Sequence, residues 1–104
     1  MEPSWQWGFG VRPIVSIIIP AYEEGEGVVA VLRRLGEAVV LPSEIVVVVD
    51  SKDDSTISFV EELALEDKRL RVVVNSYGRG PANAIRFGID ASQAPVVVVT
   101  MADG

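Results

Sequence analysis

Glu44-Ile45-Val46-Val47-Val48-Val49-Asp50 contains an unbroken β-branched run, Ile45 to Val49, that ends directly in the carboxylate of Asp50. A strand with one solvated face alternates apolar and polar residues, whereas this run does not alternate, which is typical of a strand buried on both faces of a parallel sheet. Its last residue, Asp50, is therefore expected at the carboxyl edge of that sheet. Three further runs share the pattern, namely Ile14 to Ile19, Leu70 to Val74 and Val96 to Val99.

Segments with the apolar spacing of amphipathic helices separate the four runs. Their expected core stripes are Val28, Val31, Leu32, Leu35 and Val39 in the first segment, Phe59, Val60 and Leu63 in the second, and Ala82, Ile85 and Ile89 in the third. Four strands thus alternate with three helices. Right-handed crossovers of this length predict a Rossmann-like, doubly wound α/β sheet of strand order 3-2-1-4, whose ligands bind beyond the carboxyl ends, between the first and fourth strands.

Residues at the expected helix starts agree with this fold. Asp54, Ser55 or Thr56 can cap the second helix, and Asp53 is interpreted in the same way, because Asp and Ser are preferred caps. In Gly80-Pro81 the proline suits a first helical position, where a missing N–H costs nothing.

Composition excludes several classes of function. The net charge is −6 and the nine Lys and Arg residues are scattered, which argues against a nucleic-acid partner. The chain has no Cys and no His, so disulfides, thiolate zinc sites and imidazole bases are excluded, and any chemistry must use carboxylates, hydroxyls, backbone amides and a hard cation. No apolar run reaches the roughly 18 to 20 residues of a transmembrane helix.

Residues 1–13 are assigned to an N-terminal extension and residues 14–104 to one domain. The extension has neither a basic start nor an apolar stretch, so it does not resemble a secretory signal, and a cytoplasmic location is expected. Trp5, Trp7 and Phe9 are expected to pack back onto the domain, the alternative being contact with a membrane interface or a partner.

Acidic residues are expected to gather at the carboxyl edge, from Glu23 and Glu24 after the first strand, Asp50 after the second and Asp103 after the fourth. Mg²⁺ or Mn²⁺, bound by few carboxylates and completed by substrate phosphates, would relieve their repulsion. Asp50 could accept hydrogen bonds from a ribose hydroxyl or a base N–H. The alternatives are a helix cap at Asp50 and an ordinary solvated carboxylate at Asp103.

A loop with two glycines, Asn75-Ser76-Tyr77-Gly78-Arg79-Gly80-Pro81, precedes the third helix. Free N–H groups and the helix dipole favour phosphate there, and Arg79 adds a positive charge. The loop lacks the third glycine of the dinucleotide fingerprint and the Lys of a P-loop, and a plain glycine turn is the alternative. Tyr22, in the loop after the first strand, could stack on a base or cover a core edge.

Four stretches together resemble the family 2 glycosyltransferases of the GT-A fold, most of all the polyprenyl-phosphate sugar transferases of the dolichol-phosphate mannose synthase kind. They are Val15 to Glu24, Glu44 to Asp50, Gly78-Arg79-Gly80 and Met101-Ala102-Asp103. The resemblance implies that this chain is the donor-nucleotide half of a longer enzyme, since the acceptor-binding half of the family follows the last of these motifs. It also implies that the longer protein acts at the cytoplasmic face of a membrane.

The resemblance also implies roles for individual residues. The family's Pro-x-Tyr-Asn-Glu loop matches Pro20 to Glu24, with Glu23 in place of the usual Asn, and Asp50 matches the Asp that reads the nucleobase. The candidate donor-binding residues are thus Pro20, Ala21, Tyr22, Glu24 and Asp50, to which the loop argument adds Arg79.

The family's metal-binding Asp-x-Asp matches Met101-Ala102-Asp103. Asp103 is therefore the candidate metal ligand and catalytic residue, for Mg²⁺ or Mn²⁺. Because Met101 replaces the first Asp, metal binding should be weakened or moved onto the diphosphate and onto residues that follow.

The implied activity is inverting transfer of a sugar from a nucleotide diphosphate sugar to an acceptor such as a polyprenyl phosphate. A nucleotidyltransferase is an alternative, although the segment from Pro20 to Gly27 lacks its basic loop. A receiver-like module is another, although no Lys follows the last strand, and a non-catalytic nucleotide-binding unit is a third. An open edge at the fourth strand predicts homo-oligomers.

Overall fold

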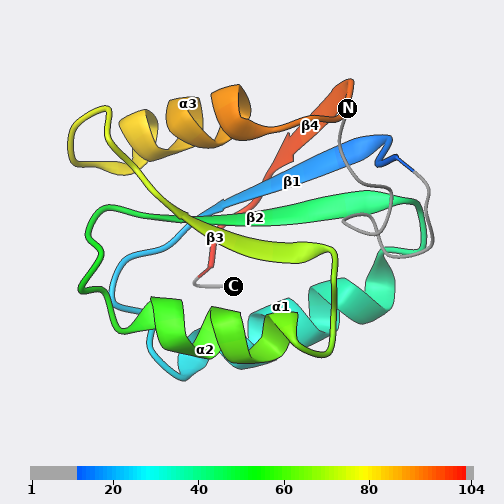
Figure 1. Ribbon diagram of the computed structural model, residues 1–104, viewed down its shortest axis with the longest axis horizontal. Coiled ribbons are helices and arrows are strands. Elements are labelled where there is room, and N and C mark those ends of the chain that lie inside the picture. Colours follow the sequence, from blue (N-terminus) through cyan, green and yellow to red (C-terminus); the bar gives the residue numbers. More distant parts are fainter. Residues whose placement is uncertain (1–11, 103–104) are drawn as a thin grey trace.

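A computed structural model describes residues 12–102 and shows a single parallel sheet between two layers of helices (Figure 1). The elements in chain order are β1 (Val15–Pro20), α1 (Gly27–Ala38), β2 (Ser43–Val49), α2 (Thr56–Ala64), β3 (Leu70–Val74), α3 (Pro81–Ala91) and β4 (Val96–Val99). The strand order is β3-β2-β1-β4 and every pair is parallel. The expected Rossmann-like fold and strand order are thus confirmed, while the assignments made for Trp5, Trp7 and Phe9 lie outside the described residues.

The two central strands explain why their sequences do not alternate. On β1, Ile17 and Ile19 join the core under α1 and α2, whereas Ile18 faces the opposite side, under α3. Val46 on β2 likewise faces the α3 side, and all of these side chains are at most 5% exposed. Both faces of β1 and β2 are therefore buried, as is typical of parallel strands between two layers of helices.

The same prediction of two buried faces is wrong for β4. Val96, Val98 and Val99 are 55%, 47% and 41% exposed. The strand pairs with β1 at one edge of the sheet, and α3 packs over β1 and β2 rather than over β4. Within residues 12–102 this edge therefore presents apolar side chains and unpaired backbone groups.

The expected core stripe of α3 is also wrong. Ala82 and Ile89 are exposed and Ile85 is only partly buried, whereas Ala84 and Gly88 are the buried residues of this helix. The helix is rotated so that its smallest residues face the sheet. Small side chains carry little hydrophobic signal, so the pattern of large apolar residues pointed to the wrong face.

The close approach of α3 to the sheet is centred on Gly88. A Cβ atom at this position would lie 2.5 Å from Cγ2 of Ile18 and 3.0 Å from Cγ2 of Val48. Carbon atoms in contact are normally about 3.5 to 4.0 Å apart. Glycine is therefore required for the observed distance between α3 and the two central strands.

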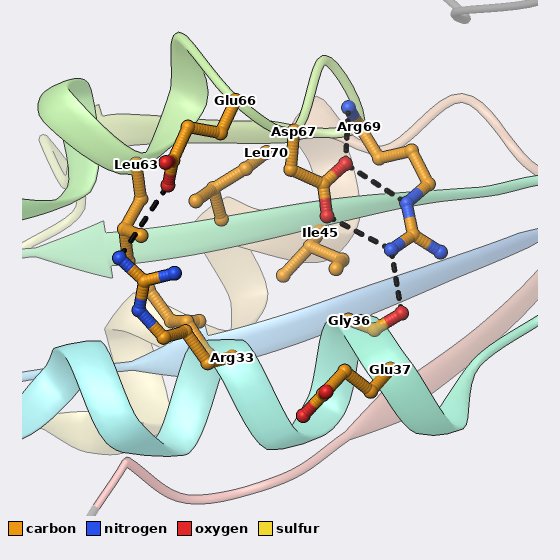
Figure 2. Close-up of a pocket in the computed structure, with 10 residues that line it drawn as sticks. Arg33, Gly36, Glu37, Ile45, Leu63, Glu66, Asp67, Arg69 and Leu70 are labelled. Atoms are coloured by element: carbon orange, nitrogen blue, oxygen red, sulfur yellow. Dashed lines mark hydrogen bonds and ion pairs between the residues drawn. The ribbon is translucent and has the colours of Figure 1, made fainter.

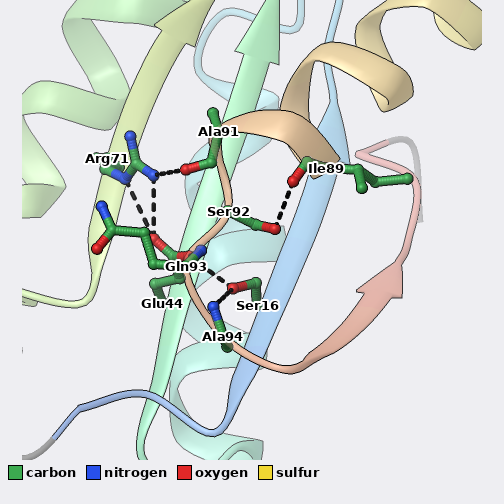
Figure 3. A network of polar contacts seen from close by, with 8 residues as sticks. All are labelled: Ser16, Glu44, Arg71, Ile89, Ala91, Ser92, Gln93 and Ala94. Carbon is green, nitrogen blue, oxygen red and sulfur yellow. Dashed lines mark hydrogen bonds and ion pairs between the residues drawn. The ribbon is translucent and has the colours of Figure 1, made fainter.

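A buried carboxylate ties the start of β4 to the amino edge of the sheet (Figure 3). Glu44, which is 1% exposed, accepts hydrogen bonds from Ser16 Oγ at 2.6 Å, the Gln93 backbone N–H at 2.7 Å and Arg71 Nη2 at 3.1 Å. Ser16 Oγ in turn accepts the Ala94 N–H at 3.2 Å. The connection from α3 into β4 is thereby fastened to β1, β2 and β3.

None of the helices found in residues 12–102 has the length and apolar character needed to cross a bilayer.

Candidate functional site

A pocket of about 440 Å³ lies at the carboxyl edge of the sheet. It is bounded by the loops that follow β1 and β2, by the start of α3 and by the segment after β4, so it occupies the switch point between β1 and β4. Its lining residues are Pro20, Ala21, Tyr22, Asp50, Arg79, Gly80, Pro81, Ala84 and Met101. Five of the seven candidate residues named from the sequence thus surround one pocket, the other two being Glu24 and Asp103.

Tyr22 offers an aromatic face to this pocket. Its side chain is 69% exposed, while the preceding Ala21 is buried and donates its backbone N–H to Val48 O at 2.9 Å. The loop is therefore anchored one residue before the ring and the ring itself is free of the core. The alternative that Tyr22 covers a core edge is wrong.

Hydrogen bonds to the start of α2 set the shape of the Tyr22 loop. The Glu23 N–H donates to Asp54 Oδ2 and the Glu24 N–H to Thr56 Oγ1, both at 2.9 Å. Asp54 Oδ1 accepts the Thr56 N–H at 2.7 Å, as expected of a residue that caps this helix. Glu23 adopts a left-handed φ of 48°, a conformation that costs free energy for any residue with a side chain.

The ionised form of Asp54 is stabilised by this arrangement. Burial is the largest single influence and opposes ionisation, but hydrogen bonds from the Glu23 backbone and from the Thr56 hydroxyl and backbone together outweigh it and lower the pKa of Asp54 below its ordinary value. A charged Asp54 thus supports the pocket loop as well as α2. Asp53, also interpreted as a cap, makes no such contact with its side chain in the described part of the chain.

The expected convergence of acidic side chains does not occur among the described residues. Glu23 Oε2 accepts a hydrogen bond from Ser55 Oγ, directly before α2, at 3.3 Å, and Glu24 Oε2 accepts the Tyr22 N–H of its own loop at 3.3 Å. No group of three or more acidic side chains that could hold a metal ion is found between residues 12 and 102. Asp103 lies outside the described residues.

Asp50 enters the pocket from the end of β2 and also holds the neighbouring loop. Its Oδ1 accepts Asn75 Nδ2 at 2.8 Å and its Oδ2 accepts the Gly80 N–H at 3.0 Å. The alternative role as a cap of the helix that follows β2 is therefore wrong. An ionised carboxylate has about four acceptor positions, so Asp50 can accept further hydrogen bonds from a ligand.

Asn75 is a residue of this site that the sequence did not single out. It is 7% exposed, and besides Asp50 it binds Gly78 O through Nδ2 at 2.7 Å and the Tyr77 N–H through Oδ1 at 2.8 Å. The available signal was its place directly after β3 and before the Gly-x-Gly turn, the same strand-end position that drew attention to Asp50.

The Gly-x-Gly turn owes its glycines to backbone conformation. Gly78 and Gly80 have φ values of 108° and 113°, which residues with a Cβ rarely adopt, and Pro81 begins α3 as predicted. The Gly80 N–H donates to Asp50. Contrary to the expectation from the sequence, it is therefore not free to bind phosphate. Arg79 between the two glycines is exposed and lines the pocket.

The loop that carries Arg79 is also fastened to the outer face of α3. Tyr77 donates its hydroxyl to Asp90 Oδ2 at 2.7 Å, which raises the pKa of Tyr77. Its ring lies edge-on to Phe87, with centroids 5.1 Å apart, and under the guanidinium of Arg86 at 5.8 Å. These contacts limit the freedom of the loop on the side away from the pocket.

Two other hollows, of about 500 and 710 Å³, lie between α1 and α2, and the first is shown in Figure 2. In the described part of the chain, four of its five charged lining residues are paired, the exception being Glu37. Arg69 binds Asp67 and the backbone oxygens of Gly36 and Val39, and Arg33 pairs with Glu66 at 3.4 Å. The pocket at the carboxyl edge, with an exposed aromatic ring, a carboxylate and a guanidinium, is the better candidate for ligand binding.

The sequence is similar to those of known proteins over most of its length. Residues 16–104 match the model of glycosyl transferase family 2. An uncharacterized glycosyltransferase of Haemophilus influenzae is 31% identical over 81 residues, which cover 74% of this chain and 24% of that protein. The dolichol-phosphate mannosyltransferase of Mycosarcoma maydis is 26% identical over 104 residues, which cover 93% of this chain and 35% of that protein.

Solved structures agree in fold. A mannosyltransferase from Pyrobaculum calidifontis, in complex with GDP-Man and Mn²⁺, superposes with a TM-score of 0.75 at 31% identity, covering 89% of this chain and 28% of that one. The glucosyl-3-phosphoglycerate synthase of Mycobacterium tuberculosis, in complex with UDP, has a TM-score of 0.66 at 19% identity, covering 100% of this chain and 39% of that one. The chain thus spans about a quarter to two fifths of the length of these relatives.

Proposed function

The chain belongs to glycosyl transferase family 2, and from that premise we propose that its carboxyl-edge pocket binds the nucleotide of a nucleotide diphosphate sugar. The observation that carries the proposal is the meeting of Tyr22, Asp50 and Arg79 around one pocket. These residues come from three different loops, and they supply the three kinds of contact that a nucleoside diphosphate needs. Membership of this family weighs against the nucleotidyltransferase and receiver-like alternatives.

Each of the three residues has a distinct part in the proposal. The exposed ring of Tyr22 stacks on the base, since base stacking on an aromatic side chain contributes about 1 to 3 kcal/mol. Asp50 accepts hydrogen bonds from the base or ribose with its remaining lone pairs. Arg79 pairs with the diphosphate, because its guanidinium matches phosphate geometry. Pro20, Ala21 and Glu24 shape the loop that carries Tyr22.

The proposed reaction is inverting sugar transfer. An acceptor oxygen attacks the anomeric carbon, the bond to the diphosphate breaks, and negative charge develops on the leaving diphosphate. Stabilising that charge is the principal catalytic demand, and Arg79 is the cation among the pocket-lining residues that meets it. A polyprenyl phosphate acceptor, as the similarity to the Mycosarcoma maydis enzyme suggests, is already anionic and needs no general base.

A divalent cation is the proposed cofactor, with Mn²⁺ favoured by the Pyrobaculum calidifontis complex and Mg²⁺ as the alternative. The described residues fit such an ion poorly by themselves, because Met101 offers a thioether where a hard cation prefers oxygen. Asp103 would therefore hold it as the protein carboxylate, with diphosphate oxygens completing the coordination. When bound there, the ion would add to the neutralisation of the leaving group.

The proposed setting is the cytoplasm, at the membrane face where a polyprenyl phosphate would be met. We also propose that chains associate through β4, whose edge is open in residues 12–102. Neither feature is needed for nucleotide binding.

Calorimetric titration of UDP, GDP and their sugar conjugates, with Mn²⁺, with Mg²⁺ and with EDTA, tests the proposal. Arg79→Ala should weaken diphosphate binding about tenfold, since hydrogen bonds to charged groups contribute about 1.5 to 3 kcal/mol. Arg34→Ala is the matched control, because it removes the same charge from an exposed position on α1, across the sheet. Tyr22→Ala should weaken the binding of nucleotides but leave the binding of inorganic diphosphate unchanged.

Selective binding of one nucleotide that is weakened in Arg79→Ala and unchanged in Arg34→Ala would support the donor site and identify its base. A metal effect that disappears in Asp103→Ala would assign the cation. Absence of binding to every nucleotide in the panel, by a protein with a cooperative thermal transition, would reject the proposed function.

A further inference from the structure

Asn75 closes a ring of hydrogen bonds behind the candidate nucleotide pocket. From Asp50 the ring passes through Asn75 Nδ2 to Gly78 O, along the backbone to the Gly80 N–H and back to Asp50. The side chain that would read the base and the turn that carries Arg79 are thus joined through one buried amide. We infer that Asn75 is the positioning residue that fixes the Asp50 carboxylate and Arg79 for nucleotide recognition, an inference that rests on the proposed function.

The chemistry of the contacts determines the orientation of the amide. Asp50 and Gly78 present only acceptors, so they must face the NH₂ group, and the Tyr77 backbone N–H is a donor, so it must face Oδ1. Both amide hydrogens and the amide oxygen are then used. A side chain that is 7% exposed and fully satisfied has one stable arrangement, which transmits its position to all three partners.

Backbone contacts hold Asn75 itself. Its N–H donates to Val49 O at 2.7 Å, which continues the pairing of β3 with β2 beyond the last ladder residue. The amide is therefore placed by the sheet and not by the turn that follows. Asp50 directly follows β2, so the same strand fixes the positions of both partners in the 2.8 Å hydrogen bond between Asn75 and Asp50.

Fixing the Asp50 carboxylate through Asn75 should affect the discrimination between nucleotides as well as the affinity for them. With Asn75 in place, Asp50 presents its remaining lone pairs in one direction, which favours the base whose N–H groups lie in that direction. Without the amide, the carboxylate can rotate and Gly80 loses a fixed partner. The difference between a preferred and a disfavoured nucleotide should then decrease, because a loosely held acceptor adapts to either base.

Asn75→Ala and Asn75→Asp test the inference, with Asn83→Asp as the matched control. Asn83 lies on α3, does not line the pocket and contacts the turn only through one long hydrogen bond of 3.4 Å to Arg79 O, so Asn83→Asp makes the same change of charge beside the turn without removing a side-chain contact to Asp50. The measurements are calorimetric affinities for UDP and GDP and, without nucleotide, the hydrogen exchange of the Gly80 amide by NMR. Circular dichroism verifies that each variant is folded.

We expect Asn75→Ala to weaken the preferred nucleotide about tenfold, to reduce its preference over the other nucleotide and to speed Gly80 exchange about tenfold. Asn75→Asp places a second carboxylate at hydrogen-bond distance from Asp50. Two carboxylates at this distance repel each other when both are ionised, so lowering the pH from about 7.5 to about 5.5 should place a shared proton between them and recover part of the affinity. The wild-type protein and Asn83→Asp, measured at both pH values, correct for titration of the nucleotide.

The outcomes separate the inference from the proposed function. If wild-type protein binds a nucleotide and Asn75→Ala binds it equally well with unchanged Gly80 exchange, the inference alone is overturned. If affinity falls in Asn75→Asp without recovery at the lower pH, the loss does not depend on the hydrogen bond between residue 75 and Asp50, and the positioning role is rejected. If the wild-type protein binds no nucleotide, the proposed function fails and the inference fails with it.

Discussion

Replacing Gly88 by Ala tests whether α3 is held at its observed distance from the sheet. The new Cβ would lie 2.5 Å from Ile18 Cγ2, about 1 Å inside normal carbon contact, and the buried, β-branched side chains of Ile18 and Val48 cannot turn aside easily. Overpacking of this kind costs up to about 3 kcal/mol, against which alanine gains about 1 kcal/mol of helix propensity. We expect a net loss of about 2 kcal/mol in the free energy of unfolding, measured by urea denaturation.

The expected displacement of α3 also reaches the pocket. Pro81 and Ala84 line it, and the Gly80 N–H is 3.0 Å from Asp50, so a helix pushed outward by about 1 Å would lengthen that bond beyond a useful distance. Nucleotide affinity should therefore fall together with stability.

Gly27→Ala is the control for Gly88→Ala. Gly27 is the first residue of α1, and the position that an alanine Cβ would occupy there has no neighbouring atom within 4 Å, so its replacement should be neutral or stabilising by up to about 1 kcal/mol. A Gly88→Ala protein as stable as the wild type would refute the reasoning, because it would mean that Ile18 can turn aside at no cost.

Three further predictions concern the rest of the chain. Glu44→Ala should lower the free energy of unfolding by about 1 to 3 kcal/mol, since it leaves the buried Ser16 hydroxyl without its acceptor and removes the partner of the half-exposed Arg71, and Glu44→Gln, which keeps one acceptor oxygen, should cost clearly less; equal losses in urea denaturation would contradict this, because they would mean that the negative charge and not the hydrogen bonds stabilises the network. The folded-state pKa values of Asp54 and Asp67 are lowered, so their ionised forms add stability that is complete above the ordinary value of 3.8 and is lost as the pH falls below it. Thermal melts should show this loss below about pH 4, and a smaller loss in Asp54→Asn; identical pH profiles would contradict it. Light scattering should show concentration-dependent association of the wild-type chain that Val98→Lys abolishes, whereas a wild-type monomer at high concentration would contradict pairing through β4.

The order and pairing of the strands could be predicted because the relevant signals are local. The runs around Ile18 and Val47 are β-branched and unbroken, and each is followed by a turn and a helical stripe, so the alternation of elements was evident without knowledge of tertiary contacts. The fold rules for right-handed crossovers then leave few arrangements. The burial of β4 could not be predicted in this way, because its neighbours in space, not its own residues, determine how much of Val98 is covered.

In the site, too, some residues could be predicted from local sequence and others depend on contacts between distant parts of the chain. Tyr22, Asp50 and Arg79 were recognisable because they follow strands or occupy a turn of known chemistry, and the topology alone brings those positions to one edge. The orientations of Glu23 and Asn75 depend instead on hydrogen bonds to distant parts of the chain. Glu23 binds Asp54, which is 31 positions away, and Asn75 binds Asp50, which is 25 positions away. No periodicity or motif encodes such a contact, so the structure was needed to find it.

The two buried or half-buried carboxylates of the sheet indicate how structural and binding roles can be separated. Glu44 at the amino edge is 1% exposed and accepts four hydrogen bonds, so its acceptor capacity is used and no ligand can approach it. Asp50 at the carboxyl edge faces a pocket and accepts two hydrogen bonds, both from the loop that forms the wall of that pocket. The same carboxylate chemistry thus fastens the fold at one end, where every lone pair is satisfied, and stays available at the other, where the bonds it already makes hold it in a fixed direction for a further one.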